Sequence, residues 1–262
     1  MRNSGEKYVY PIDNFFKKWY TEERIKPTRI LVRSKTVLGE YEVAEELLDD
    51  LKIVQDTRYY RFTSDSVLLT RFAKPKTKDV VADFCSGSGV VAFHFYAINR
   101  DVPFQSFTLF EMQKTLADLS KKTIELNNFG SLFQVENCKI QDIGKEYCGK
   151  FSLILCNPPY EKGGFDNDCY EKAVCRKEIT VTLKEIAEKA SYALKFGGRL
   201  AIINRADRLA ELCYTLHAVN IEVKRIQLVQ GKAGDKPYLV MVEGVKGGKP
   251  CSDVLCNLVN EK

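Results

Sequence analysis

From residue 79 onward, short apolar runs alternate along the chain with segments whose apolar positions recur at helical spacing. Short apolar runs are typical of strands buried in a sheet, and a period near 3.6 residues is typical of helices packed against one. Their alternation predicts an α/β fold with a mostly parallel sheet and helices on both faces. The predicted strands cover 79–84, 104–110, 132–135, 151–156, 200–203, 221–229 and 238–242, and the predicted helices 90–98, 112–127, 179–194 and 209–216.

The helix over 179–194 is expected to stop at Gly197-Gly198, because glycine readily adopts the backbone conformation that ends a helix. The last two predicted strands follow each other without a helix between them, so we expect an antiparallel hairpin. Residues 1–45 differ, with Tyr, Phe and Trp side chains interleaved with Lys and Arg. This pattern fits a nucleic-acid surface, but it also fits an appendage whose aromatic side chains pack on the main domain. We favour the second interpretation and expect an N-terminal appendage over 1–45 and one main domain over 46–262.

The composition excludes several kinds of site and leaves nucleic-acid binding open. With 40 Lys and Arg against 35 Asp and Glu, the 262-residue chain carries a net charge of +5, which is compatible with a nucleic-acid partner. The nine cysteines include no C-x-x-C pair and His94 lies far from His217, so neither a zinc site nor a histidine-centred triad is expected. We find no secretory signal and no membrane-length apolar run, and we expect a cytoplasmic protein with reduced thiols.

The run Asn157-Pro158-Pro159-Tyr160 directly follows the predicted strand 151–156. Each proline fixes φ and lacks an N–H group, so this backbone is stiff and rich in carbonyl acceptors. The Asn157 side chain adds an acceptor, and Tyr160 adds a flat face for stacking. An amine conjugated to a ring is a weak nucleophile, and two oxygens that accept its hydrogens would expose its lone pair. The run therefore predicts a site for a planar, amine-bearing group; the alternative is a rigid turn without a ligand.

A glycine-rich turn, Asp83-Phe84-Cys85-Ser86-Gly87-Ser88-Gly89, joins the first predicted strand to the first helix. Ligands of open α/β sheets bind beyond the carboxyl ends of the strands, and Gly87 and Gly89 let the backbone approach a ligand closely. The turn lacks both the G-K-[ST] sequence of a phosphate-binding loop and the G-x-G-x-x-G dinucleotide sequence. An acidic residue followed by such a turn fits a ligand with a cationic or hydroxyl-bearing part better than a pyrophosphate.

Two further acidic residues follow the next two predicted strands. Glu111 is placed to accept hydrogen bonds from both hydroxyls of a ribose, and Asp142 could bind an adenine amino group. Taken alone, Asp83 and Asp142 could equally cap helices, and Glu111 could be a solvated strand end. Three acidic positions at successive strand ends, together with the glycine-rich turn, favour a binding site.

In this order, the 83–89 turn, Glu111, Asp142 and N-P-P-Y resemble the class I S-adenosylmethionine-dependent methyltransferases that act on amino nitrogens. Further motifs narrow the resemblance to the bacterial tRNA adenine-37 N6-methyltransferases that act on a valine tRNA. These motifs are the lead-in at 51–55 and 60–69, the pair Gly163-Gly164, the A-R-H-E-like element at 175–178, the R-x-x-R-L-like run at 205–209 and the E-G-x-K-G-G-x-P-like ending at 243–250.

The resemblance implies a Rossmann-like class I methyltransferase fold with a mostly parallel seven-stranded sheet. It also implies S-adenosyl-L-methionine as cofactor and transfer of its methyl group to N6 of adenosine 37 in a valine tRNA. We expect a monomer that binds tRNA and neither a metal nor a membrane. The resemblance implies that the cofactor is covered by Phe62, Thr63 and Asp65. It implies contacts with the methionine part for Asp83, Cys85, Gly87 and Gly89, with the ribose for Glu111 and with the adenine for Asp142, and it also places Asn157 among the cofactor-binding residues. It further implies that the substrate base is held by Asn157, Pro158, Pro159 and Tyr160.

Two residues depart from the family pattern. Cys85 stands where the turn usually has its first glycine, and Lys177 replaces the histidine of the A-R-H-E element, so no role is carried over to that side chain. The basic residues of 1–45 and 161–178, with Lys246 and Lys249, are candidate RNA contacts.

Three alternative functions use parts of the same pattern. A glutamine-amide methyltransferase acting on a protein such as a release factor shares the N-P-P-Y chemistry, but it usually has a helical N-terminal domain larger than residues 1–45. A DNA adenine methyltransferase would need a separate recognition domain. A non-catalytic RNA-binding factor would not need an intact N-P-P-Y run or the acidic strand ends.

Overall fold

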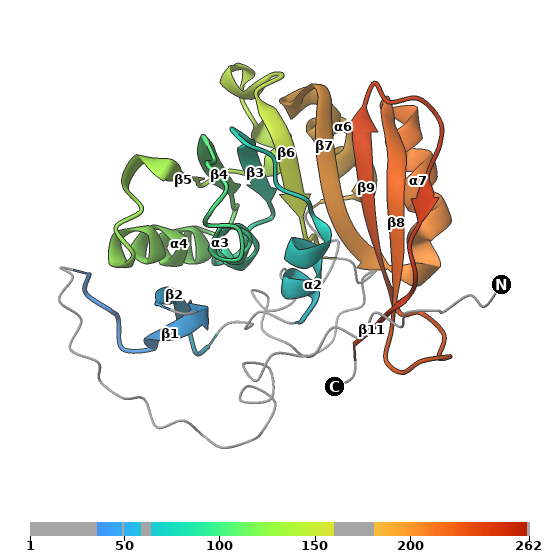
Figure 1. The fold of residues 1–262 in the computed structure, drawn as a ribbon. Helices are drawn as coiled ribbons and strands as arrows, with labels where there is room; N and C mark the ends of the chain where they lie inside the picture. The colour runs from blue at the N-terminus through green and yellow to red at the C-terminus, as the bar shows by residue number, and fades with distance from the viewer. Residues whose placement is uncertain (1–35, 49, 59–63, 160–180, 261–262) are drawn as a thin grey trace.

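The computed structural model describes residues 36–48, 50–58, 64–159 and 181–260. Its centre is a mixed sheet with the strand order β10-β8-β9-β7-β6-β3-β4-β5, in which β11 also pairs with β8 (Figure 1). Seven longer strands form most of this sheet: β3 Val80–Phe84, β4 Ser106–Phe110, β5 Phe133–Glu136, β6 Phe151–Cys156, β7 Leu194–Arg205, β8 Ile221–Gln230 and β9 Leu239–Lys246. The two-residue strands β10 Asp253–Val254 and β11 Leu258–Val259 complete it.

Strand directions confirm the predicted mostly parallel sheet. β3 pairs in parallel with β4 and β6, β4 with β5, and β6 with β7. β9 runs antiparallel to both β7 and β8, which confirms the predicted hairpin. From β3 the chain builds β4 and β5 on one side, and after β5 it returns to form β6 on the other side of β3. The switch point of the sheet therefore lies between the neighbouring strands β3 and β6. Open α/β sheets bind ligands at such a switch point.

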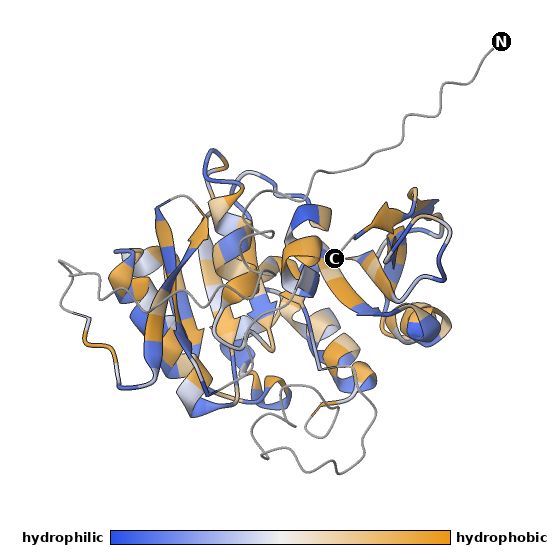
Figure 2. Cartoon of the chain, turned by 90° about the horizontal axis from the view of Figure 1, so that it is seen from below, coloured by the Kyte–Doolittle hydropathy of each residue, from blue (hydrophilic) through white to orange (hydrophobic). Residues whose placement is uncertain are grey.

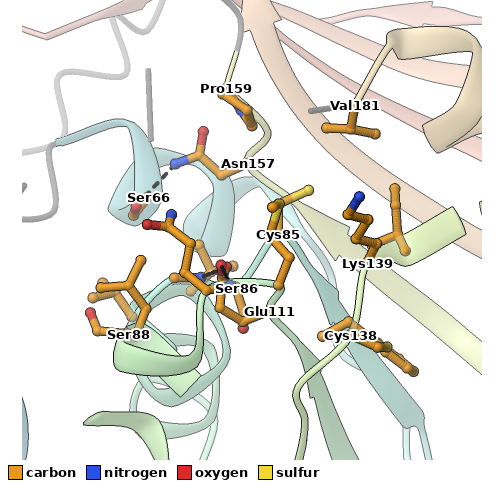
Figure 3. Close-up of a pocket in the computed structure, with 18 of the residues that line it drawn as sticks. Ser66, Cys85, Ser86, Ser88, Glu111, Cys138, Lys139, Asn157, Pro159 and Val181 are labelled. Atoms are coloured by element: carbon orange, nitrogen blue, oxygen red, sulfur yellow. Dashed lines mark hydrogen bonds between the residues drawn. The ribbon is translucent and has the colours of Figure 1, made fainter. Parts of the chain in front are cut away.

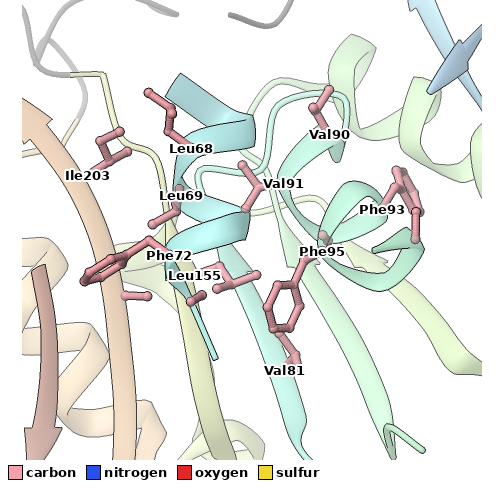
Figure 4. Close-up of a cluster of buried hydrophobic side chains, with 14 of the residues drawn as sticks. Leu68, Leu69, Phe72, Val81, Val90, Val91, Phe93, Phe95, Leu155 and Ile203 are labelled. Carbon is pink, nitrogen blue, oxygen red and sulfur yellow. The ribbon is translucent and has the colours of Figure 1, made fainter. Parts of the chain in front are cut away.

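Two layers of apolar side chains cover the sheet, one on each face. Successive strand residues point to opposite faces, so Val81 packs in one cluster and its neighbour Ala82 in the other. Figure 4 shows the first cluster, in which α2 and α3 pack on the strands. Figure 2 shows hydrophobic residues on both the strands and the helices. The described α-helices are α2 Ser64–Phe72, α3 Val90–Ala97, α4 Lys114–Leu126, α6 Leu183–Ala193 and α7 Leu209–Ala218. The helices α6 and α7 pack in the second cluster. The short 3₁₀ helices are η1 Gly130–Leu132, η2 Ile140–Asp142, η3 Lys145–Tyr147 and η4 Ala206–Arg208.

A separate β-hairpin, β1 Glu42–Leu48 and β2 Leu51–Asp56, packs against α4. The Val54 N–H donates to Thr123 Oγ1 at 2.9 Å, which ties β2 to that helix. The predicted boundary between residues 45 and 46 falls inside β1, and residues 1–35 lie outside the described part of the chain.

The prediction for 179–194 is wrong at its carboxyl end. α6 begins after a capping box formed by Thr182 and Glu185 and ends at Ala193, and β7 already begins at Leu194. Gly197 and Gly198 therefore lie in a strand and do not end a helix. The cause is tertiary, because Leu194 pairs with Phe151 of β6 and the register shifts in the next residues. Among the described helices, none is long and apolar enough to cross a membrane.

Candidate active site

A cavity of about 160 Å³ opens where β3, β4 and β6 end (Figure 3). It lies at the switch point of the sheet, and its wall combines the turn after β3, the residues after β4 and β5, the start of α2 and the residues after β6. The predicted site residues that line it are Cys85, Gly87, Glu111, Asn157 and Pro159. The topology therefore brings together residues separated by as many as 74 positions.

The turn after β3 adopts a backbone conformation that is unfavourable for most residues other than glycine. Cys85, Gly87 and Gly89 all have positive φ, at 58°, 57° and 83°. At Gly89 an added Cβ would lie 2.5 Å from a ring carbon of Phe93 and 2.7 Å from Leu109, so only glycine fits. Cys85 adopts the left-handed conformation despite having a side chain, which is costly for a residue other than glycine.

Glu111 is held by this turn and directed to the cavity. Its side chain is 5% exposed, and its two carboxylate oxygens accept from the Gly87 N–H and the Gln113 N–H, each at 2.8 Å. Burial raises the pKa of Glu111, whereas these backbone hydrogen bonds act in the opposite direction. Each carboxylate oxygen has lone pairs left to accept from a ligand, so the geometry allows the predicted contact with a pair of hydroxyls.

Asp83 lies beneath the turn and does not line the cavity. Only 1% of it is exposed; one carboxyl oxygen accepts from the Ala92 N–H at 3.1 Å, and the other has no hydrogen-bond partner. Burial, with the nearby charge of Glu111, raises the pKa of Asp83 to about 8. The hydroxyl of Ser86, which does line the cavity, is also buried without a partner. An unpartnered hydroxyl on the cavity wall indicates a place for a polar ligand group.

Asp142 also lies outside the cavity wall. It ends η2 and is exposed, whereas Cys138 and Gln141 line the cavity. The sequence did not single out these two residues, although both come shortly after β5. The contact of Asp142 with an adenine group stays a prediction, and its side chain would have to turn to make it.

Asn157, at the end of β6, reaches the cavity together with Pro159, and Pro158 is buried beside them. The Asn157 Nδ2 donates to Ser66 Oγ at 3.0 Å (Figure 3). Ser66 is a lining residue that sequence reasoning missed, although it lies in the 60–69 run. Asp65, its neighbour, is half-buried and accepts from Ser64 Oγ at 3.3 Å without lining the cavity.

Other predicted residues are not described or lie elsewhere. Phe62, Thr63 and Tyr160, and the basic loop 161–178, fall in segments that the structure does not describe. Lys246 donates to the Leu194 carbonyl, at the edge of the sheet opposite the cavity, so it is not placed to contact a substrate there. Lys249 follows it at that same edge. Within the described ranges, no group of three or more Cys, His, Asp or Glu residues could hold a metal.

Comparisons with known proteins agree with this geometry. The family described as "Methyltransferase small domain" matches residues 63–231. A curated protein of Shewanella sediminis, named tRNA1(Val) (adenine(37)-N6)-methyltransferase, is 22% identical over 180 residues, which are 67% of this chain and 72% of that protein.

Two solved structures have the same fold. A predicted O-methyltransferase from Agrobacterium tumefaciens has a TM-score of 0.59 at 18% identity, over 74% of this chain and 86% of that one. A geranyl diphosphate C-methyltransferase from Streptomyces coelicolor, solved with S-adenosyl-L-homocysteine, has a TM-score of 0.50 at 11% identity, over 70% and 78%. With the family match covering more than half of its length, this chain belongs to the methyltransferase small domain family.

Proposed function

We propose that the protein transfers a methyl group from S-adenosyl-L-methionine to the exocyclic N6 of adenine in tRNA, at adenosine 37 of a valine tRNA. The observation that carries this proposal is the position of Asn157 and Pro159 on the wall of the cavity that Glu111 and the glycine-rich turn form. The name of the Shewanella sediminis relative supports the choice of substrate.

The cavity fits S-adenosyl-L-methionine on its own chemistry. The cofactor carries an ammonium group and a ribose, and the cavity wall offers the hydroxyl of Ser86 together with the carboxylate of Glu111. Asp83 lies beneath the turn, so its contact with the methionine part of the cofactor stays a prediction. When bound, the cofactor supplies a methyl group activated by a sulfonium.

The substrate amine needs acceptors and no base. Asn157 Oδ1 and the Pro158 carbonyl accept the amino hydrogens, which concentrates the nitrogen lone pair on the side facing the methyl group. The adenine has to leave its stack to enter, and Tyr160 is proposed to stack on it. Methyl transfer makes the amine cationic, and a cationic amine loses its proton readily to water. His94 is buried on α3 against Thr70 and is not used.

The alternative acceptor is a glutamine amide of a protein such as a release factor, which the same oxygens could hold. We favour the tRNA, because the curated relative carries a tRNA name. We also propose that the enzyme works as a monomer in the cytoplasm. The seven cysteines of the described ranges are all free thiols, which is compatible with a reducing compartment.

The test is methylation of unmodified valine tRNA by the purified protein with radiolabelled S-adenosylmethionine, followed by nucleoside analysis. We expect N6-methyladenosine, and no label on the same tRNA with guanosine at position 37. Asn157→Ala should abolish turnover while S-adenosylhomocysteine still binds with similar affinity by calorimetry. Label on a release factor in place of tRNA would establish the alternative, and turnover by Asn157→Ala would refute the assigned role.

A further inference from the structure

Ser66 and Asn157 make a direct contact between two parts of the fold that lie 91 positions apart. Ser66 is in the first turn of α2 and Asn157 at the end of β6, and their side chains point toward one another on the cavity wall (Figure 3). The distance from Asn157 Nδ2 to Ser66 Oγ is 3.0 Å, and Ser66 is only 6% exposed. The hydrogen bond is therefore largely screened from water.

The two ends of the Asn157 amide have opposite chemistry. Nδ2 can only donate and Oδ1 can only accept, so only one orientation of the amide can bind the hydrogens of a substrate amine. In the other orientation the Asn157 Nδ2 group would face the substrate amine, and both groups are donors. In the structure the Ser66 hydroxyl accepts from Nδ2, which leaves Oδ1 as the end available to the substrate. A hydroxyl can also donate, so this contact holds the amide in place, and the donors of the substrate amine select the orientation.

Ser66 is in turn held by an anchored helix. At the amino end of α2, Asn260 Nδ2 donates to Ser64 Oγ at 3.3 Å and to Tyr238 OH at 2.8 Å. At its carboxyl end, Arg225 Nη2 donates to the Phe72 carbonyl at 3.1 Å. A reactive group is most effective when the residues that orient it are themselves fixed.

We propose that Ser66 is a positioning residue that holds the side-chain amide of Asn157 in place, with its Oδ1 facing the substrate amine. This inference rests on the proposed methyl transfer. Ser66 does not contact the reacting atoms in this role and acts only through Asn157. The α2 helix thus has a part in catalysis that extends beyond packing.

The test compares Ser66→Ala with Ser66→Thr, which keeps the hydroxyl. For Ser66→Ala we expect kcat on tRNA to fall by about 10- to 100-fold, since a misplacement of about 1 Å can cost about 10²-fold in rate. The Kd for S-adenosylhomocysteine, measured by calorimetry, should stay within about twofold, because the lost hydrogen bond joins Ser66 to Asn157 and not to the cofactor. Ser66→Thr should recover most of the lost rate.

Ser191→Ala is the matched control, because Ser191 Oγ donates to the Val219 carbonyl at 2.6 Å, far from the cavity along α6. It removes a similar hydrogen bond and should keep the native kcat. An unchanged kcat in Ser66→Ala would overturn the inference, as would a loss explained by a weaker Kd, since Ser66 would then bind the cofactor. If the native protein methylates no tRNA, the proposed function fails and this inference fails with it. Native activity with an unaffected Ser66→Ala would refute the inference alone.

Discussion

Replacing Asp83 by asparagine tests whether this buried residue of β3 keeps its proton in the folded protein. Asp83 has a pKa of about 8 in the folded protein, against 3.8 for an exposed aspartic acid. Between these values the native state keeps a proton that the unfolded state has lost, so unfolding releases it. The free energy of unfolding must therefore fall as the pH rises through this window. Below pH 3.8 both states are protonated and the effect disappears.

The magnitude follows from the same linkage. One pH unit inside the window changes the free energy of unfolding by about 1.4 kcal/mol, so the rise from pH 5 to pH 8 lowers it by about 4 kcal/mol. An asparagine at position 83 never titrates, and the Asp83→Asn protein lacks this loss. We expect the stability of Asp83→Asn relative to the native protein to increase by about 4 kcal/mol across that range.

The assay is urea denaturation of both proteins without cofactor at pH 5, 6, 7 and 8. Any constant cost of the new amide group is the same at each pH, so the slope of the difference is the quantity to compare. Ser86→Ala is the control, because it removes a buried polar group without a titrating proton from the turn after β3. A difference that stays flat from pH 5 to pH 8 would show that Asp83 is ionised in the folded protein and would refute the reasoning.

Three further predictions concern neighbouring parts of the fold. Arg199→Met should lower the free energy of unfolding by about 3–5 kcal/mol in urea, because it leaves Asp79, now paired at 2.7 Å, as a buried charge; a loss below about 1 kcal/mol would contradict this. Gly89→Ala should lower the melting temperature and weaken S-adenosylhomocysteine binding, since its Cβ would overlap Phe93; native values for both would show that the turn adapts. Glu111→Gln should weaken S-adenosylhomocysteine binding by about tenfold or more in calorimetry, because hydrogen bonds to a charged group are worth about 1.5–3 kcal/mol; an unchanged Kd would exclude Glu111 from the binding site.

The sequence by itself determined the central sheet and the position of its key motif. The largely apolar run 151–156 coincides with β6 from its first residue to its last, because a strand buried on both faces carries few polar side chains. Asn157 follows that strand, so its place at the carboxyl edge was predictable. Glu111 was also predictable, because in a parallel sheet the residues after β3, β4 and β6 meet at one edge.

Only the tertiary structure decided which side chains near that edge reach the cavity. Asp83 lies within β3 and is buried beneath the turn, whereas Asp142 ends η2 and is exposed. The strand and the 3₁₀ turn that carry these residues place them differently, although both were predicted to face one ligand. The start of β7 at Leu194 depends on pairing with β6, which glycine preference could not reveal. The hydrogen bond from Asn157 to Ser66 needs α2 to pack beside the end of β6. Contacts of this kind depend on the assembled sheet, since no local pattern links two residues 91 positions apart.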